Sequence, residues 1–301
     1  MATRVVAVGR RLRQGWRCRR RLVRRVIRRL QRALFLFQAS KPPVDSCCPR
    51  CSHAMRPQDH PVKFMLFVCA SCGHQKQLDF EFSWRETYVN GIRILPQVKD
   101  QGDETTCVFF AIATAIEAML NMEMAQRGER YSESISISDM VEYFENCKWE
   151  SSVPKNMELG LAKIKTCLEM LQTIGALTQK GKKKPEELLQ ASDYVRIKDS
   201  CWHDGLSFEE VCTLVLEGKM LVTIVPITDH FHELKADEIY DCTHIQWGAS
   251  ETFHAMVIVG FGVKDGKTYF RVQNSHGSYW ADFGFGMIRD NSIAKILQLI
   301  V

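Results

Sequence analysis

One part of the chain carries an almost uninterrupted apolar run, from Val108 to Leu120. The run is too long for one strand, contains no Gly or Pro, and is rich in Ala, Met and Leu. It therefore predicts a helix that is buried nearly all round. Thr105 and Thr106 stand just before it as candidate N-caps. This pattern places Cys107 in the first turn of a buried helix.

A second apolar run, FHAMVIVGFG, contains His254 and has the pattern of a buried strand ended by glycines. Asp265-Gly266 follows as a hairpin turn signal, and residues 268–273 alternate between apolar and polar side chains. The returning strand ends at Asn274. The hairpin is therefore expected to bring Asn274 back beside His254.

The order of these patterns bears on the fold class. Helix patterns dominate before Gln190 and strand patterns follow Met220. With 301 residues and 46% hydrophobic side chains, the chain has ample material for a core. We expect an α+β fold.

The first 44 residues differ in charge from the rest. They contain 13 Arg and one Lys with no Asp or Glu, so the total of +5 minus their +14 leaves −9 for the remaining residues. The basic charge thus belongs to an arm, residues 1–44, which is expected to be disordered or an amphipathic helix. Within it, RRLVRRVIRRLQRALFLF carries apolar residues at helical spacing between arginines.

Three interpretations of this arm stay open: a targeting segment for a mitochondrion or plastid, a nuclear localisation or nucleic-acid-binding patch, and a membrane-surface helix. A solvated tail is the alternative to all three. The chain has no secretory apolar segment and no run of about 20 apolar residues, so neither secretion nor a transmembrane segment is expected. We predict an intracellular protein whose arm meets nucleic acid or another anionic partner.

Two Cys-x-x-Cys pairs follow the arm, Cys48 with Cys51 and Cys69 with Cys72, separated by 17 residues. Four thiolates at this spacing are typical of a structural zinc site, which leaves no open position for chemistry. Zinc is favoured over disulfides because no secretory signal is present. No organic cofactor is expected.

The residues around these cysteines predict a zinc-ribbon-like module over residues 45–82. Cys47 is a less suitable ligand than Cys48, which has the two-residue gap and a following proline. Strands over residues 64–68 and 77–82 are expected to complete a hairpin. So short a module depends on its metal to fold.

Cys107 is a candidate nucleophile, since a helix N-terminus favours the thiolate. The alternative is a small core residue, because free cysteines are often buried. A partner base decides between them. His254 fits, since a polar ring in an apolar strand is unfavourable unless it is paired. If the side-chain oxygen of Asn274 accepts a hydrogen bond from one imidazole nitrogen, the other nitrogen is left to face a thiol.

Several segments resemble, in order, those of the papain-like cysteine peptidases, the family of papain and the cathepsins. WRETYVNGIRILPQVKDQG resembles the start of the mature enzymes, with Gln101 six residues before Cys107. LEGKMLVTIVPI and HELKADEIYDCTH resemble the strand and loop before the family's histidine. FHAMVIVGFG and VQNSHGSYWADFGFGMIR resemble its histidine and asparagine segments. The match runs from about Trp84 to Arg289.

The resemblance implies a role for each matched residue. Cys107 is the nucleophile, His254 the general base and later acid, and Asn274 the residue that orients the imidazole. Gln101 and the backbone N–H of Cys107 form the oxyanion hole. The resemblance also implies a thiolate–imidazolium pair and an acyl-thiol intermediate.

The resemblance further implies a two-lobe fold over residues 83–301 with the cleft between the lobes. The helical lobe covers about 100–200 and the β-rich lobe about 201–301. The function implied is a cysteine-type peptidase that hydrolyses peptide bonds in peptide or protein substrates.

Four positions depart from the family's pattern. Thr105 stands where the family has Gly, Val108 where it has an aromatic residue, Glu104 where it has a disulfide-bonded Cys, and His276 where Trp shields the His–Asn hydrogen bond. The departures at Thr105, Val108 and His276 keep open a second function. In it the chain is a catalytically weak or inactive peptide-binding protein, whose ribbon and arm bind nucleic acid or a protein partner.

Overall fold

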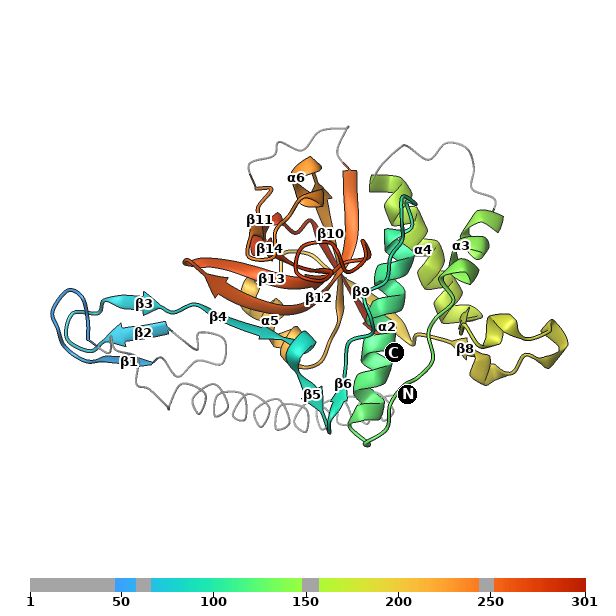
Figure 1. The fold of residues 1–301 in the computed structure, drawn as a ribbon, viewed down its shortest axis with the longest axis horizontal. Helices are drawn as coiled ribbons and strands as arrows, with labels where there is room; N and C mark the ends of the chain where they lie inside the picture. The colour runs from blue at the N-terminus through green and yellow to red at the C-terminus, as the bar shows by residue number, and fades with distance from the viewer. Residues whose placement is uncertain (1–46, 58–65, 148–156, 244–251) are drawn as a thin grey trace, which may run out of the picture. The chain divides into compact units, whose positions relative to one another are not determined.

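The computed structural model describes residues 47–57, 66–147, 157–243 and 252–301. The chain divides into two compact units, residues 1–79 with 212–217 and residues 80–211 with 218–301. The basic arm lies outside the described residues (Figure 1).

The cysteine-rich unit contains a three-stranded antiparallel sheet. Its order is β1 (Met55–Pro57), β2 (Leu66–Cys69) and β3 (Gln75–Gln77). Its small core consists of Cys48, Met55 and Cys69, with Cys51 and Phe67 packed against them. So few apolar side chains bury little surface, which is why a unit of this size needs another source of stability.

The predicted ribbon strand over residues 77–82 is wrong. The ribbon's last strand, β3, ends at Gln77. The next strand, β4 (Phe80–Ser83), pairs with β12 (Thr252–Lys264) in the main sheet. Of the other predicted strand, residues 64–68, the structure describes β2, which starts at Leu66, and residues 64 and 65 lie outside the described part.

Two glycines in β12 explain why β4 pairs there. Gly260 lies opposite Ser83 and Gly262 opposite Glu81. A Cβ on Gly260 would overlap the carbonyl oxygen of Phe82, and one on Gly262 would overlap the Tyr269 side chain. Only glycine permits this close approach of two backbones.

The helical lobe is built from α2 (Cys107–Ala125), α3 (Ile137–Asn146) and α4 (Met157–Thr173), which contact one another. As the sequence predicts, α2 is buried along most of its length, and it lies beside β12 (Figure 1). In the described part of the chain, α2 alone is long and apolar enough to cross a membrane, but 67% of its apolar window is buried, as in a core helix.

The β-rich lobe is an eight-stranded sheet. Seven strands follow the order β11-β14-β13-β12-β10-β15-β9, and β4 joins at β12. The strands not yet bounded are β9 (Asp199–His203), β10 (Leu221–Ile227), β11 (Ile239–Tyr240), β13 (Lys267–Gln273), β14 (Phe285–Arg289) and β15 (Lys295–Ile300). Helices thus precede most of this sheet in the sequence, as predicted.

The predicted hairpin turn joins β12 to β13. Asp265 and Gly266 both have positive φ, of 51° and 70°. This is the conformation of the tight turn that suits twisted antiparallel strands. The alternation predicted for residues 268–273 does not appear as burial, because both faces of β13 are buried from Tyr269 to Gln273.

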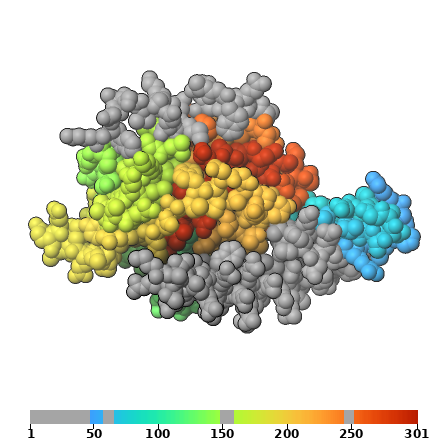
Figure 2. Space-filling model, turned by 180° about the vertical axis from the view of Figure 1, so that it is seen from behind, coloured from blue at the N-terminus to red at the C-terminus, as the bar shows by residue number. Residues whose placement is uncertain are grey.

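Short elements complete the fold. The segment between α4 and β9, coloured yellow, projects from the helical lobe (Figure 2). It holds β7 (Ala176–Leu177), β8 (Tyr194–Val195) and the 3-10 turns η2 (Gly181–Lys183), η3 (Glu186–Leu188) and η4 (Ala191–Asp193). The others are η1 (Trp84–Glu86), β5 (Tyr88–Val89), β6 (Ile92–Arg93), α5 (Phe208–Leu216), α6 (Asp229–His232) and η5 (Asp290–Ser292).

Candidate active site

Cys107 is the first residue of α2, and Thr106 is its N-cap. Thr106 does not cap the helix with its side chain, and its Oγ1 is buried without a hydrogen-bond partner among the described residues. Helix α2 contacts β12, and the backbone of Ala255 lies near enough to the Cys107 thiol to lower its pKa. Because Ala255 follows His254 in β12, this contact brings the thiol to the strand that carries the imidazole.

His254 is held by Asn274. The Nε2 of His254 lies 2.6 Å from the Oδ1 of Asn274, as the sequence predicts, and both side chains are buried. The backbone N–H of Ser275 donates to the same Oδ1 at 2.7 Å. Because an oxygen accepts both bonds, Nε2 must be the protonated nitrogen of a neutral His254, which leaves Nδ1 as the basic one.

Burial has the largest effect on the pKa values of both Cys107 and His254. It raises the pKa of the Cys107 thiol, against the opposing effects of the Ala255 backbone and the Lys163 charge. It lowers the pKa of His254 to about 4, although the bond to Asn274 acts in the other direction. The unliganded cleft therefore favours a neutral thiol beside a neutral imidazole, whereas the resemblance implies an ion pair.

Gln101 is locked by three hydrogen bonds. Its backbone N–H donates to the carbonyl of Ser275 at 2.8 Å, and its Oε1 accepts from the Ser275 hydroxyl at 2.6 Å. Its Nε2, the donor that an oxyanion hole would use, donates to the carbonyl of Glu104 at 2.5 Å. Gln101 thus lies beside the Asn274 segment with its amide N–H engaged by the loop before Cys107.

Cys107 and His254 line one cleft of about 460 Å³. The loop 101–105 lines it as well, with the rings of His232, His276 and Tyr279. Asn274 is not part of the lining and lies buried behind His254.

Two further histidines lie beside His254. The ring centroid of His276 is 4.5 Å from that of His254, and His232 stacks on His276 at 5.5 Å. Burial lowers the pKa of His276 to about 4, and the charges of His254 and His232 lower it further, while Asp100 raises it. An aromatic ring thus still covers this side of His254, but it is one that can take up a proton.

Lys163 was not singled out from the sequence. Its Nζ, from α4, donates to the carbonyl of Thr105 at 2.5 Å and to the Thr105 hydroxyl at 3.1 Å. These two residues are 58 positions apart in the chain. A lysine in a helix gives no local sequence signal of such a contact, and His232 was not singled out from the sequence either.

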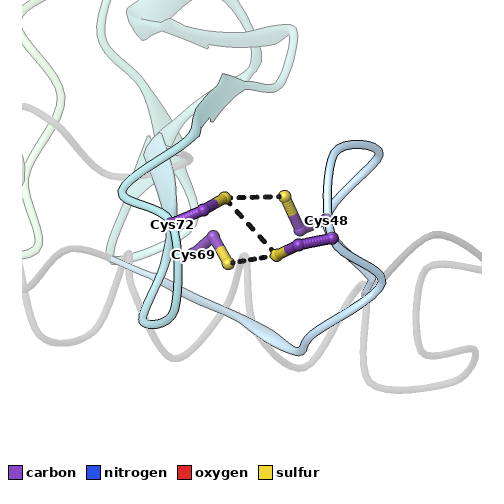
Figure 3. A group of neighbouring side chains, drawn as sticks. Cys48, Cys69 and Cys72 are labelled. Atoms are coloured by element: carbon purple, nitrogen blue, oxygen red, sulfur yellow. Dashed lines mark hydrogen bonds between the residues drawn. The ribbon is translucent and has the colours of Figure 1, made fainter.

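The four predicted metal ligands come together. The sulfurs of Cys48, Cys51, Cys69 and Cys72 all lie within 4.8 Å of one another, with close pairs at 3.4 to 3.5 Å. Figure 3 shows the side chains of Cys48, Cys69 and Cys72 pointing toward one another. Thiolates bound to zinc at about 2.3 Å in a tetrahedron are roughly 3.8 Å apart, so this donor set fits zinc.

The two Cys-x-x-Cys turns are built alike. The backbone N–H groups of Ser52 and Gly73 donate to the carbonyls of Cys48 and Cys69 at 2.8 and 2.9 Å. Both residues have positive φ. The similarity extends one residue further, because the backbone N–H groups of Cys48 and Cys69 donate to the carbonyls of His53 and His74, each at 2.8 Å. Cys47 is exposed and is not a member of the sulfur cluster.

The chain matches the family model of the papain family cysteine proteases over residues 78–298. It is 26% identical over 208 residues to the thiol protease aleurain of Arabidopsis thaliana. The matched residues make up 67% of this chain and 53% of aleurain. The chain thus spans about half the length of this curated relative.

Solved structures with the same fold include the digestive procathepsin L2 proteinase from Tenebrio molitor larval midgut, with a TM-score of 0.55, 18% identity and coverage of 75% of this chain and 69% of that one. The Amb a 11 cysteine protease, a ragweed pollen allergen solved in its proform, has a TM-score of 0.52 and 17% identity, and the match covers 77% of this chain and 67% of that one. They confirm the α+β, papain-like fold expected from the sequence. By its family match, the chain belongs to the papain family of cysteine proteases.

Proposed function

We propose that the protein is a cysteine-type peptidase that hydrolyses peptide bonds in peptide or protein substrates. One observation carries the proposal. Cys107 begins a buried helix against the strand of His254, His254 is hydrogen-bonded to Asn274, and thiol and imidazole line one cleft. A nucleophile, a base and a group that orients the base are the components that acyl transfer needs.

The proposed reaction has two stages. The Cys107 sulfur attacks the substrate carbonyl carbon while its proton passes to Nδ1 of His254, which then protonates the departing amine. A water molecule, deprotonated by His254, next attacks the thioester and releases the acid and the thiol. A neutral imidazole is the form that accepts a proton, and its low pKa of about 4 keeps it neutral near pH 7.

Asn274 and Gln101 have supporting roles in this proposal. The Oδ1 of Asn274 holds the imidazole through Nε2, so that Nδ1 faces the cleft. Gln101 and the backbone N–H of Cys107 are proposed to stabilise the oxyanion. One N–H of the Gln101 Nε2 donates to the carbonyl of Glu104, so the oxyanion would be bound by the second N–H of the same amide.

The test compares Cys107→Ala with Cys201→Ala, a change at an exposed cysteine. Fluorogenic peptides of mixed sequence serve as substrates, and thermal unfolding checks the fold of each variant. We expect Cys107→Ala to lose hydrolysis at an unchanged unfolding temperature, while Cys201→Ala keeps both. Equal hydrolysis by wild type and Cys107→Ala would exclude Cys107 as the nucleophile.

A second candidate function is peptide binding with weak or no catalysis. It is favoured by the engaged Nε2 of Gln101 and by the Thr105 side chain in the cleft lining. In this case the wild type binds peptides without cleaving them, and Cys107→Ala binds them equally well. Measurable cleavage by the wild type that is lost in Cys107→Ala decides for the peptidase.

We also propose that Cys48, Cys51, Cys69 and Cys72 hold a structural zinc ion. The sulfur cluster and the paired turns around it support this. Four thiolates would close the coordination sphere, so the metal would stabilise the unit and take no part in hydrolysis.

For the arm we propose an anionic partner, such as nucleic acid, and a location in an organelle or the nucleus. The support is the excess of 14 positive charges in residues 1–44. If nucleic acid binds there, added salt should weaken binding steeply and deletion of residues 1–44 should abolish it. Binding that survives the deletion contradicts this role.

A further inference from the structure

Lys163 connects α4 to the segment that carries the candidate nucleophile. Its ammonium donates to both the carbonyl and the hydroxyl of Thr105, at 2.5 and 3.1 Å. It also lies 6.0 Å from the centroid of the Phe144 ring. The side chain is half-buried, so Lys163 is fixed rather than free in solvent.

The place of this charge needs an explanation. A cation near a helix N-terminus is unfavourable, because the free N–H groups there already carry partial positive charge. Burial also lowers the pKa of Lys163 and so opposes its charged form. The stability of α2 therefore does not explain why the Lys163 ammonium binds to Thr105, two residues before the helix begins.

An anion at Cys107 would supply the reason. The Lys163 charge favours the thiolate of Cys107, and that thiolate in turn favours charged Lys163. The exposed carboxylate of Glu145 on α3 also favours charged Lys163. The charged form of Lys163 is thus favoured by one surface carboxylate and by the thiolate of Cys107.

Other titratable groups also face Cys107 or its base. His254 lies on β12, His276 follows β13, and His232 ends α6. The pKa values of His254 and His276 are lowered to about 4, so both rings are neutral near pH 7. Asp100 faces His276.

Two acidic side chains complete this set. Asp103 and Glu104 are exposed on the loop that lines the cleft. Their charges oppose a thiolate. Among these groups, Lys163 carries a positive charge that can balance a thiolate near neutral pH.

We propose that Lys163 is a positioning residue, which anchors the segment before α2 through Thr105 and supplies a fixed positive charge that stabilises the Cys107 thiolate. This inference rests on the proposed function for its catalytic meaning. It adds a partner of the nucleophile to the residues that the family resemblance implies. The thiolate is then less dependent on a protonated His254.

The test is the pH dependence of Cys107 alkylation by iodoacetamide in the full-length chain, followed by peptide mass mapping. The thiolate displaces iodide from the reagent, so the rate follows the thiolate fraction. Lys163→Met removes the charge and the hydrogen bonds, and Lys163→Arg keeps a cation. Lys165→Met, at an exposed position of the same helix, is the matched control.

We expect Lys163→Met to react about tenfold more slowly at pH 7, with its rate curve moved to higher pH. Lys163→Arg and Lys165→Met should follow the wild type. If Lys163→Met and wild type have the same curve, the charge role is wrong. If Lys163→Met does not fold, Lys163→Gln, which keeps a polar end without the charge, replaces it and is judged by the same outcomes.

Alkylation needs no substrate, which separates this inference from the proposed function. A shifted curve in a protein that cleaves no peptide supports the role of Lys163 and counts against the peptidase. An unshifted curve in an active peptidase does the reverse. Thr105→Val removes the hydroxyl acceptor but keeps the shorter bond to the carbonyl, so Lys163 should keep its place and the alkylation curve should stay that of the wild type.

Discussion

The imidazole of His276 lies against that of His254, with ring centroids 4.5 Å apart and planes inclined by 45°. Burial keeps both rings neutral near pH 7, and the charge of one opposes protonation of the other. The two histidines therefore titrate as a coupled pair. This pair makes the acid behaviour of the cleft testable.

We predict that His276→Gln moves the acid limb of kcat/KM for peptide hydrolysis to higher pH. The change removes a ring that can be protonated, and the smaller side chain reduces the burial that lowers the pKa of His254. The pKa of His254 therefore rises, and the base is lost at a higher pH. A pH series of initial rates measures the shift. His230→Gln, at an exposed histidine paired with Glu238 outside the cleft lining, should leave the limb in place.

Stability should also depend on His254. Its pKa in the folded protein, about 4, lies below the usual 6.5, so the unfolded chain binds more protons between these values. The stabilising effect is complete above pH 6.5 and is lost as pH falls toward 4. It amounts to about 3 kcal/mol at most.

Urea unfolding at several pH values from 7 to 4 measures this loss. Because carboxyl groups also titrate in the acid range, the comparison is between wild type and His254→Gln. The variant should lose less free energy of unfolding than the wild type over the same interval. Equal pH dependence in both proteins contradicts a low pKa for His254.

Local sequence patterns were sufficient for the elements that carry the candidate site. The apolar run after Cys107 is helical because it lacks breakers, and the Asp265-Gly266 turn returns β13 along β12. An irregularity between Ile258 and Gly260 then shifts the register by one residue, which the sequence did not indicate and which brings the side chains of His254 and Asn274 to the same face. The helix and turn predictions worked because each depends on residues close in sequence, or on one tight turn.

Contacts between distant segments were not predictable in this way. A strand was expected over residues 77–82, but its partner was not indicated correctly, because Gly260 and Gly262 in β12 allow β4 to pair there. Likewise, no pattern around Lys163 indicates that it reaches Thr105. Both depend on how the chain packs, which side-chain periodicity does not encode.

The close approach at Gly260 can be tested by substitution. Gly260→Ala would place a Cβ against the carbonyl oxygen of Phe82, and two paired backbones cannot separate without losing hydrogen bonds. We expect the free energy of unfolding to fall by about 2 kcal/mol or more. Gly160→Ala, in α4 with open space at its Cβ, should instead stabilise by about 0.5 to 1 kcal/mol.

Urea unfolding of both variants provides the measurement. If Gly260→Ala is as stable as the wild type, β4 is not held against β12 as the structure has it. A loss of similar size in Gly160→Ala would show that the assay responds to any added methyl group.

The zinc proposal predicts that the protein, purified without added metal and dialysed, retains about one zinc per chain by elemental analysis. Cys51→Ser removes one of four thiolates, so we expect the retained zinc to fall at least tenfold and proteolysis of residues 47–79 to become faster. Cys47→Ser is the matched control, because Cys47 is exposed and lies outside the sulfur cluster, and it should retain the metal. Equal zinc in wild type and Cys51→Ser would mean that the metal, if present, is held elsewhere. No zinc in the wild type, with Cys48, Cys51, Cys69 and Cys72 found as free thiols by mass mapping after alkylation, would mean that the sulfur cluster is stable without a metal.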